Sequence, residues 1–176
     1  VDGLETGNLS TFNSYEKFFN AFKQQLQFNI EKSVKIAQIG DEEAIKFMQH
    51  PFISASLDGC MEKGMDYVFG GAKYNFSSIT AYGFATLVDS LYNINKVVYE
   101  ENLLTLAEFV DILNSNFNNQ EIFRQKLKNH YQKWGNDKNE IDTFANEIWE
   151  LFCKEVMKYK TIRGGRYNAG AYSMGI

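Results

Sequence analysis

Apolar side chains recur at helical spacing along most of this chain. Near the N-terminus the run is Phe18, Phe22, Leu26, Ile30 and Val34. Intervals of four residues place these side chains on one face, as in an amphipathic helix that packs on a core. Asn13 and Glu16 precede the run at the spacing of a capping box. The pattern therefore predicts a first helix that begins beside Asn13.

Further helices are predicted downstream. Apolar periodicity indicates helices over residues 41–50, 52–63 and 82–99, the second of them ending at Gly64. The last three helices are expected to start at capping pairs, namely Thr105 with Glu108, Asn118 with Glu121, and Asp137 with Glu140. Acceptors at these positions satisfy the free N–H groups of a first helical turn. The chain is therefore predicted to be mostly helical.

Two stretches, residues 70–78 and 163–175, break the helical pattern. Each places paired glycines before alternating aromatic and small residues, which indicates a tight entry into a short strand or an extended loop. A single strand leaves its backbone N–H and C=O groups without partners. We therefore expect one or two short strands that pair with polypeptide outside this chain.

Composition favours a globular domain and argues against two classes of partner. The 176 residues are 44% hydrophobic and 15% aromatic, which is enough for a packed core. The aromatic content fits a phenylalanine-rich core or a surface that faces another part of a larger body. The net charge is −4, and Lys and Arg are scattered rather than gathered into the basic stripe that nucleic acids require. Because no apolar run approaches the ~20 residues of a membrane span, a membrane is not expected either.

Cysteine and histidine usage points to a reduced, metal-free setting. Cys60 and Cys153 are too few for a disulfide framework, and no signal peptide opens the chain, so we expect a cytoplasmic protein. His50 and His130 have no Cys, Asp or Glu at ligand spacing, so no metal site is expected.

Short motifs follow one another in a specific order. The main ones are Asp58–Asp66, Gly70–Phe76 (Gly-Gly-Ala-Lys-Tyr-Asn-Phe), Ala85–Val98, Trp134–Asp137 (Trp-Gly-Asn-Asp) and Arg163–Tyr167 (Arg-Gly-Gly-Arg-Tyr). In this order, and over nearly the whole chain, they resemble the middle-to-late part of glycyl radical enzymes of the pyruvate formate-lyase type.

The resemblance implies a fold and a chemistry. Residues 1–176 would form a single segment of the ten-stranded α/β barrel of that family, mostly helical with one or two short strands. In the family a barrel loop carries a catalytic cysteine, and a C-terminal glycine stores a radical installed by an S-adenosylmethionine-dependent activase. The radical makes a thiyl on the cysteine, which takes hydrogen from the substrate. The implied partners are the rest of the polypeptide, the activating enzyme and a second copy in a homodimer.

Neither radical-carrying residue is expected in this chain, and the segment itself is expected to bind no cofactor. Residues 59–62 (Gly-Cys-Met-Glu) superficially copy the catalytic loop. Helical spacing from Phe52 and Leu57 instead places Cys60 beside a packed face, as a small buried thiol, and Cys153 is interpreted in the same way. The Arg-Val-x-Gly motif of the C-terminal glycyl radical domain is absent. No catalytic residue is therefore assigned, and the chain alone is not expected to be catalytically competent.

Substrate contacts are implied at the far end of the chain. In the family, the strand after the Gly-Gly-Arg-aromatic entry runs into the barrel and contributes pocket side chains. Here these positions are Tyr172, Ser173 and Met174, followed by Gly175. Tyr and Ser would hydrogen-bond a hydroxyl or a carboxylate of the substrate. Plain strand packing is the alternative role of these side chains.

The implied function is that of a radical lyase, a dehydratase or a formate C-acetyltransferase-like enzyme acting on a small polar substrate in anaerobic metabolism. The alternative is a non-catalytic helical interaction module or a truncated relic of the family. Such a module would fold alone with a closed surface, whereas a segment of an active enzyme would expose an apolar flank and strand edges.

Overall fold

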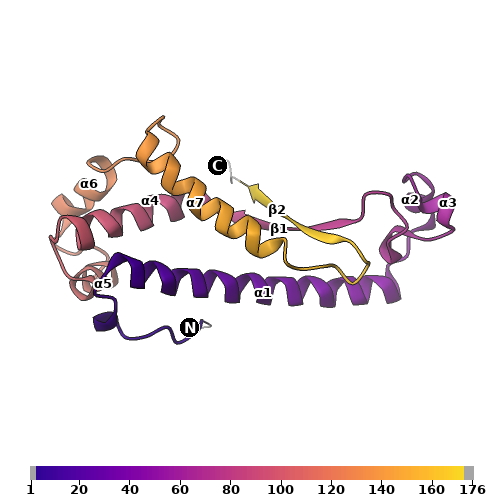
Figure 1. The fold of residues 1–176 in the computed structure, drawn as a ribbon, viewed down its shortest axis with the longest axis horizontal. Coiled ribbons are helices and arrows are strands. Elements are labelled where there is room, and N and C mark those ends of the chain that lie inside the picture. The colour runs from indigo at the N-terminus through magenta and orange to yellow at the C-terminus, as the bar shows by residue number, and fades with distance from the viewer. Residues whose placement is uncertain (1–2, 173–176) are drawn as a thin grey trace. The chain divides into compact units, whose positions relative to one another are not determined.

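In the computed structural model, which describes residues 3–172, the chain is mostly helical and contains two strands, as Figure 1 shows. This confirms the predicted fold class. The elements are α1 (Tyr15–Phe47), α2 (Pro51–Ala55), α3 (Cys60–Lys63), β1 (Phe76–Tyr82), α4 (Phe84–Ile94), α5 (Leu106–Asn114), α6 (Glu121–Asn129), α7 (Asn139–Val156) and β2 (Arg166–Tyr172). Two 3-10 turns (Leu9–Thr11 and Tyr67–Phe69) and a π-helical turn (Asn95–Glu100) are also present. No helix in the described range is long and apolar enough to cross a membrane.

Helix α1 is longer than the apolar pattern predicts. It runs without interruption to Phe47, so the separate helix expected over residues 41–50 is wrong and Gly40 lies inside α1. A glycine in a helix interior costs only about 1 kcal/mol, which a long packed helix tolerates. The hydroxyl of Ser14, rather than Asn13, lies at the start of α1, where it accepts the amide of Lys17 at 3.4 Å.

Residues 52–63 form parts of two short helices instead of the single helix expected. Helix α2 ends at Ala55, and α3 starts after Gly59, whose φ of +93° breaks the helical path. Glycine is required there because a Cβ would lie 2.8 Å from the backbone nitrogen of Lys73. The predicted end at Gly64 is confirmed by its left-handed conformation, with a φ of +58°.

Helix α4 begins later than the expected boundary at residue 82. Tyr82 is the last residue of β1, and Gly83, with a φ of +72°, turns the chain before the helix starts at Phe84. Beyond Ile94 the helix widens into the π-helical turn, where the amide of Glu101 donates to the carbonyl of Lys96 at 2.8 Å. Side-chain periodicity does not reveal either change.

Of the predicted capping pairs beyond residue 100, only Thr105 with Glu108 is formed. The Thr105 hydroxyl accepts the Glu108 amide at 3.2 Å, and the Glu108 carboxylate accepts the Thr105 amide at 2.7 Å. The other two pairs are wrong. Helix α6 follows Gln120, which makes no side-chain cap, and α7 begins at Asn139, one position too late for Asp137 to cap it.

The described residues divide into two compact units. The first unit comprises residues 3–26 and 83–150, and the second comprises residues 27–82 and 151–172. The first unit has a continuous apolar core built by α4, the π-helical turn, α5, α6 and the first part of α7, together with Phe19 of α1. Its most deeply buried side chains are Val88, Val97, Ile141, Ala145 and Ile148. Helical faces of period near 3.6 supply this core, as the sequence pattern indicates.

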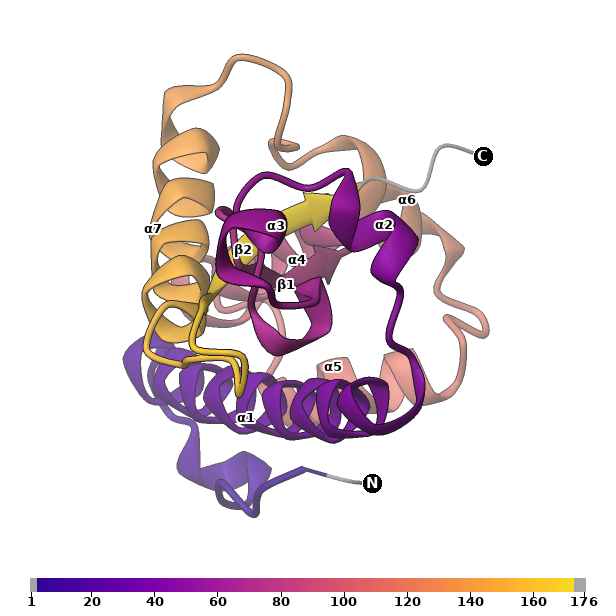
Figure 2. The ribbon, with the colours of Figure 1, turned by 90° about the vertical axis from the view of Figure 1, so that its right-hand side faces the viewer.

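In the second unit, β1 and β2 pair with each other in parallel (Figure 1), in register from Phe76 with Arg166 to Tyr82 with Tyr172. The expectation that each strand is isolated in this chain and pairs with polypeptide outside it is therefore wrong for the edge that β1 and β2 share. Parallel neighbours need a long crossover connection, and residues 83–165 between the two strands supply it. Figure 2 shows the two strands side by side.

Candidate functional site at the ends of the paired strands

The two strands finish at a pair of tyrosines. Tyr82 and Tyr172 are register partners at the carboxyl ends of β1 and β2, and their ring centroids are 5.6 Å apart. Both side chains are well exposed, at 65% and 58%. A phenol can donate and accept a hydrogen bond while its ring offers an apolar face. This end of the sheet can therefore contact a small polar molecule.

The structure reaches only the first of the predicted site residues. Tyr172 is the last residue that it describes, whereas Ser173 and Met174, with the adjacent Gly175, lie outside the described residues. The geometry brings Tyr172 together with Tyr82, which the sequence analysis did not single out. No motif signals this partnership, because it depends on the register of the two strands.

The entry to β2 is held by Arg163. Its Nη2 donates to the Oγ of Ser77 at 2.5 Å, and its Nε lies 3.3 Å from Oδ2 of Asp41. The backbone carbonyl of Arg163 accepts the side-chain amide of Asn75 at 2.6 Å. These contacts link the turn before β2 to α1 and to the start of β1. Sequence spacing does not predict them, since the partners are far apart along the chain.

The paired glycines are explained by close backbone contacts. A Cβ at Gly165 would lie 2.0 Å from the carbonyl oxygen of Asn75, and one at Gly71 would lie 2.0 Å from that of Met65. No side chain fits at either position. Gly165 therefore lets the segments that lead into β1 and β2 approach each other, and Gly71 lets the loop before β1 fold back against Met65.

Tyr167 lies in β2 opposite Ser77 and is fully buried. Burial raises the pKa of its hydroxyl, the nearby Asp41 raises it further, and Arg163 partly offsets the shift. Among the described residues, its hydroxyl oxygen has no hydrogen-bond partner. Tyr167 thus anchors β2 through its ring, not through a polar contact.

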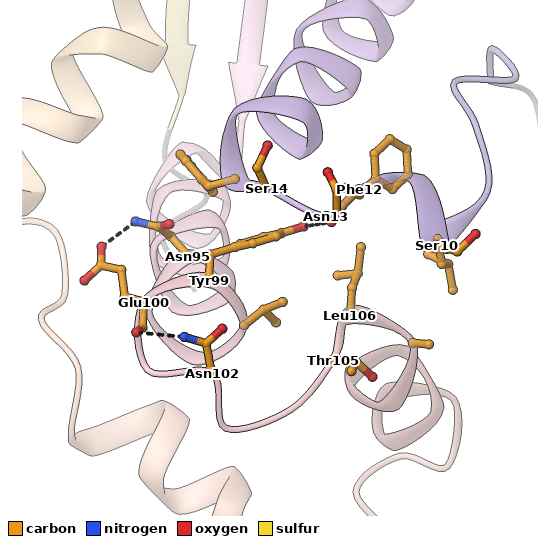
Figure 3. A pocket seen from close by; sticks show the side chains of 14 residues that line it. Ser10, Phe12, Asn13, Ser14, Asn95, Tyr99, Glu100, Asn102, Thr105 and Leu106 are labelled. Atoms are coloured by element: carbon orange, nitrogen blue, oxygen red, sulfur yellow. Dashed lines mark hydrogen bonds between the residues drawn. The ribbon is translucent and has the colours of Figure 1, made fainter.

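A cleft of about 760 Å³ lies within the first unit, between the N-terminal segment, the π-helical turn and the start of α5 (Figure 3). Its polar groups are largely engaged in internal bonds. The Tyr99 hydroxyl donates to the carbonyl of Phe12 at 3.0 Å, and the Asn95 amide donates to Glu100 at 2.7 Å. The cleft has the volume of a ligand site, but these bonds hold the protein's own segments together.

Both cysteines are free thiols. Cys60 is buried, as predicted, whereas Cys153 is only half-buried. His50 stacks on Tyr67, and its backbone amide donates to Asp66 at 2.9 Å. No cluster of His, Cys, Asp or Glu within residues 3–172 has the geometry of a metal site.

Comparison with known proteins decides the family. The model for pyruvate formate lyase-like proteins matches residues 1–176, the entire chain. The chain belongs to the pyruvate formate-lyase-like family of glycyl radical enzymes. The resemblance in the ordered motifs is thereby confirmed.

Among members of this family, the chain is similar to several dehydratases and lyases. It is 34% identical to trans-4-hydroxy-L-proline dehydratase from Clostridioides difficile, over 94% of the chain, and its structure matches that substrate-bound enzyme with a TM-score of 0.91. It matches glycerol-bound B12-independent glycerol dehydratase from Clostridium butyricum over 95% of the chain, with 34% identity and a TM-score of 0.88. It is 31% identical to isethionate sulfite-lyase from Oleidesulfovibrio alaskensis over 89% of the chain.

The chain spans about a fifth of the length of these relatives, 19–21% in each case. It corresponds to an internal segment of family members whose remaining four-fifths lie outside it. This extent fits the exposed large apolar side chains of the second unit, among them Phe47, Phe52 and Met61, which are 78%, 92% and 69% exposed. Exposed apolar surface of this kind is typical of regions that contact other polypeptide.

Proposed function

We propose that this chain is a segment of a radical dehydratase acting on a small hydroxylated substrate. The observation that carries the proposal is the 34% identity to hydroxyproline dehydratase and to glycerol dehydratase over 94–95% of the chain. The segment is then one part of a barrel domain and lacks both the catalytic cysteine loop and the C-terminal glycyl radical domain. The glycyl radical is installed by an S-adenosylmethionine-dependent activase and lies in another part of the enzyme. From there it supplies the chemistry that abstracts a hydrogen atom from the substrate. The complete enzyme is proposed to be a homodimer in the cytoplasm.

Within this enzyme, Tyr172, Ser173 and Met174 contribute to the substrate pocket. The position of Tyr172 supports this role, because its phenol is exposed at the carboxyl end of a parallel strand, where ligands of α/β proteins commonly bind. Its hydroxyl would donate to or accept from a substrate hydroxyl, and the Ser173 hydroxyl would do the same. Met174 would supply an apolar wall.

The test uses the full-length enzyme after anaerobic activation. Glycerol, trans-4-hydroxyproline, isethionate and pyruvate with coenzyme A are supplied in turn, and the products are measured. We expect loss of water from a hydroxylated substrate. Release of sulfite from isethionate, which the 31% identical relative makes the second candidate, or formation of acetyl-coenzyme A would replace the dehydratase proposal. Absence of any glycyl radical signal would favour the non-catalytic relic.

Tyr172→Phe tests the pocket assignment. Loss of one neutral hydrogen bond costs about 1 kcal/mol, so KM for the accepted substrate should rise roughly fivefold. Tyr74→Phe is the matched control, since Tyr74 is also exposed but lies in the loop before β1. A wild-type KM for Tyr172→Phe would remove Tyr172 from the pocket and leave the dehydratase assignment standing.

A further inference from the structure

The register of β1 and β2 is not set by a hairpin. The strands are parallel and separated by the long crossover of residues 83–165, so no short loop dictates which residues face each other. A slip of two residues would keep the same faces but move Tyr172 by about 7 Å relative to Tyr82. Contacts at the strand entry must therefore select the register.

Steric fit excludes most slips. The position facing the Asn75 carbonyl is occupied by Gly165, where even a Cβ would lie 2.0 Å from the oxygen. A two-residue slip in either direction would bring Arg163 or Tyr167 to this point. Neither fits, because each carries a Cβ.

Polar pairing selects the same register. The Arg163 side chain is only 15% exposed, and its partner Asp41 is 20% exposed. The guanidinium reaches Ser77 on β1 at 2.5 Å. A slip of two residues toward Ile79 would replace this hydroxyl by an apolar side chain. The largely buried guanidinium would then lose an acceptor, which costs more than an exposed contact would.

We propose that Arg163 is a positioning residue that locks β1 and β2 in register through Ser77 and Asp41, and thereby places Tyr172 beside Tyr82 at the substrate pocket. The role of Arg163 in setting the strand register does not depend on any function of Tyr172. The effect on the substrate pocket rests on the proposed function of Tyr172. Arg163 itself lies at the opposite end of β2 from Tyr172 and does not touch the substrate.

The register is tested without substrate by disulfide trapping in the full-length enzyme. Ala81 and Ala171 are register partners, and neighbouring strands lie about 4.8 Å apart, within disulfide reach. Ala81→Cys with Ala171→Cys should cross-link efficiently, and Ala81→Cys with Ala169→Cys should not. Adding Arg163→Met should reduce the first cross-link at least several-fold, because the entry to β2 is then held less firmly. The second cross-link should stay low, since Gly165 still excludes a two-residue slip. Unchanged cross-linking of the first pair would overturn the proposal.

Catalysis tests the consequence for Tyr172. In the activated full-length enzyme, Arg163→Lys should raise KM by up to about fivefold, the effect of losing the Tyr172 hydrogen bond itself, while the glycyl radical signal stays near wild type. Arg124→Lys is the control, since among the described residues Arg124 pairs only with Glu121, on the surface of α6. Ser77→Ala, which removes the hydroxyl acceptor but keeps Arg163 beside Asp41, should change KM in the same direction and serves if Arg163 variants fold poorly.

The double variant separates the two claims. If Arg163 acts through Tyr172, Arg163→Lys should add little to the KM of Tyr172→Phe. Effects that multiply independently would overturn the positioning role while leaving Tyr172 in the pocket. A wild-type KM for Tyr172→Phe alone would instead overturn the pocket assignment and, with it, the consequence for substrate binding, whereas the cross-linking result on the register would stand.

Discussion

Gly165 faces the backbone carbonyl of Asn75 so closely that a Cβ would lie 2.0 Å from its oxygen. Gly165→Ala should therefore destabilise the second unit by more than about 1 kcal/mol, because the backbone must move to admit a methyl group. Amide hydrogen exchange of peptides covering β1 and β2 should become faster in this variant.

Gly40→Ala is the matched control for that substitution. Gly40 lies inside α1, and a Cβ there would meet nothing within 4 Å. We expect a gain of about 0.5–1 kcal/mol, since alanine favours the helix. Slower exchange in α1 would agree with this, and equal effects of both alanines would contradict the steric explanation of the Gly165 contact.

Tyr167→Phe should be neutral or stabilising near pH 7, because the buried hydroxyl has no hydrogen-bond partner among the described residues. The pKa of Tyr167 is raised by burial, so the folded state holds this proton more tightly than the unfolded chain does. The stability that this difference in pKa gives the folded state is fully present below about pH 10, the ordinary tyrosine pKa. It is lost as pH rises above that value.

The measurement for Tyr167 is the unfolding midpoint in urea between pH 8 and pH 11. The wild type should lose stability more steeply than Tyr167→Phe above pH 10. Parallel curves would show that the buried hydroxyl does not titrate with folding. Tyr167→Ala should cost about 3–5 kcal/mol at all these pH values, because the ring fills the interior.

Ile148→Ala should be strongly destabilising. Ile148 is 1% exposed in the core of the first unit, and truncation of such a side chain costs about 2–5 kcal/mol. Ile122 is 91% exposed on α6, so Ile122→Ala should stay within about 0.5 kcal/mol. Denaturant unfolding measures both. A similar loss of unfolding free energy in both variants would show that other parts of the complete enzyme bury Ile122.

Thr105→Ala should weaken the start of α5 by about 1 kcal/mol, because it removes the hydroxyl that accepts the Glu108 amide. Thr105→Ser keeps the hydroxyl and serves as the control. Exchange of the first α5 amides reports the loss. No difference between the two variants would mean that the cap does not stabilise this helix.

The same cap should depend on pH. Hydrogen bonds from Thr105 lower the pKa of Glu108, so its stabilising effect is present above the ordinary glutamate pKa and fades as pH falls below it. Glu108→Gln should consequently differ from wild type at pH 7 and approach it as pH falls through the lowered pKa of Glu108. A difference that persists unchanged to acidic pH would assign the effect to geometry rather than charge.

Local signals in the sequence were sufficient for much of the secondary structure. The Thr105–Glu108 cap, the end of α3 at Gly64 and the extended segments after the paired glycines were all predicted correctly. Boundaries failed where a distant contact decided them. Gly59, for example, breaks a helix because the backbone at Lys73 packs against it.

The sequence by itself determined the helical character of the chain, its family and the location of the strands, because helical periodicity, caps and ordered motifs are local properties. Only the tertiary structure decided that β1 pairs with β2, that Arg163 joins Asp41 to Ser77, and that Tyr172 lies beside Tyr82. These relationships join residues far apart in the chain. They depend on strand register and side-chain packing, which no local spacing encodes.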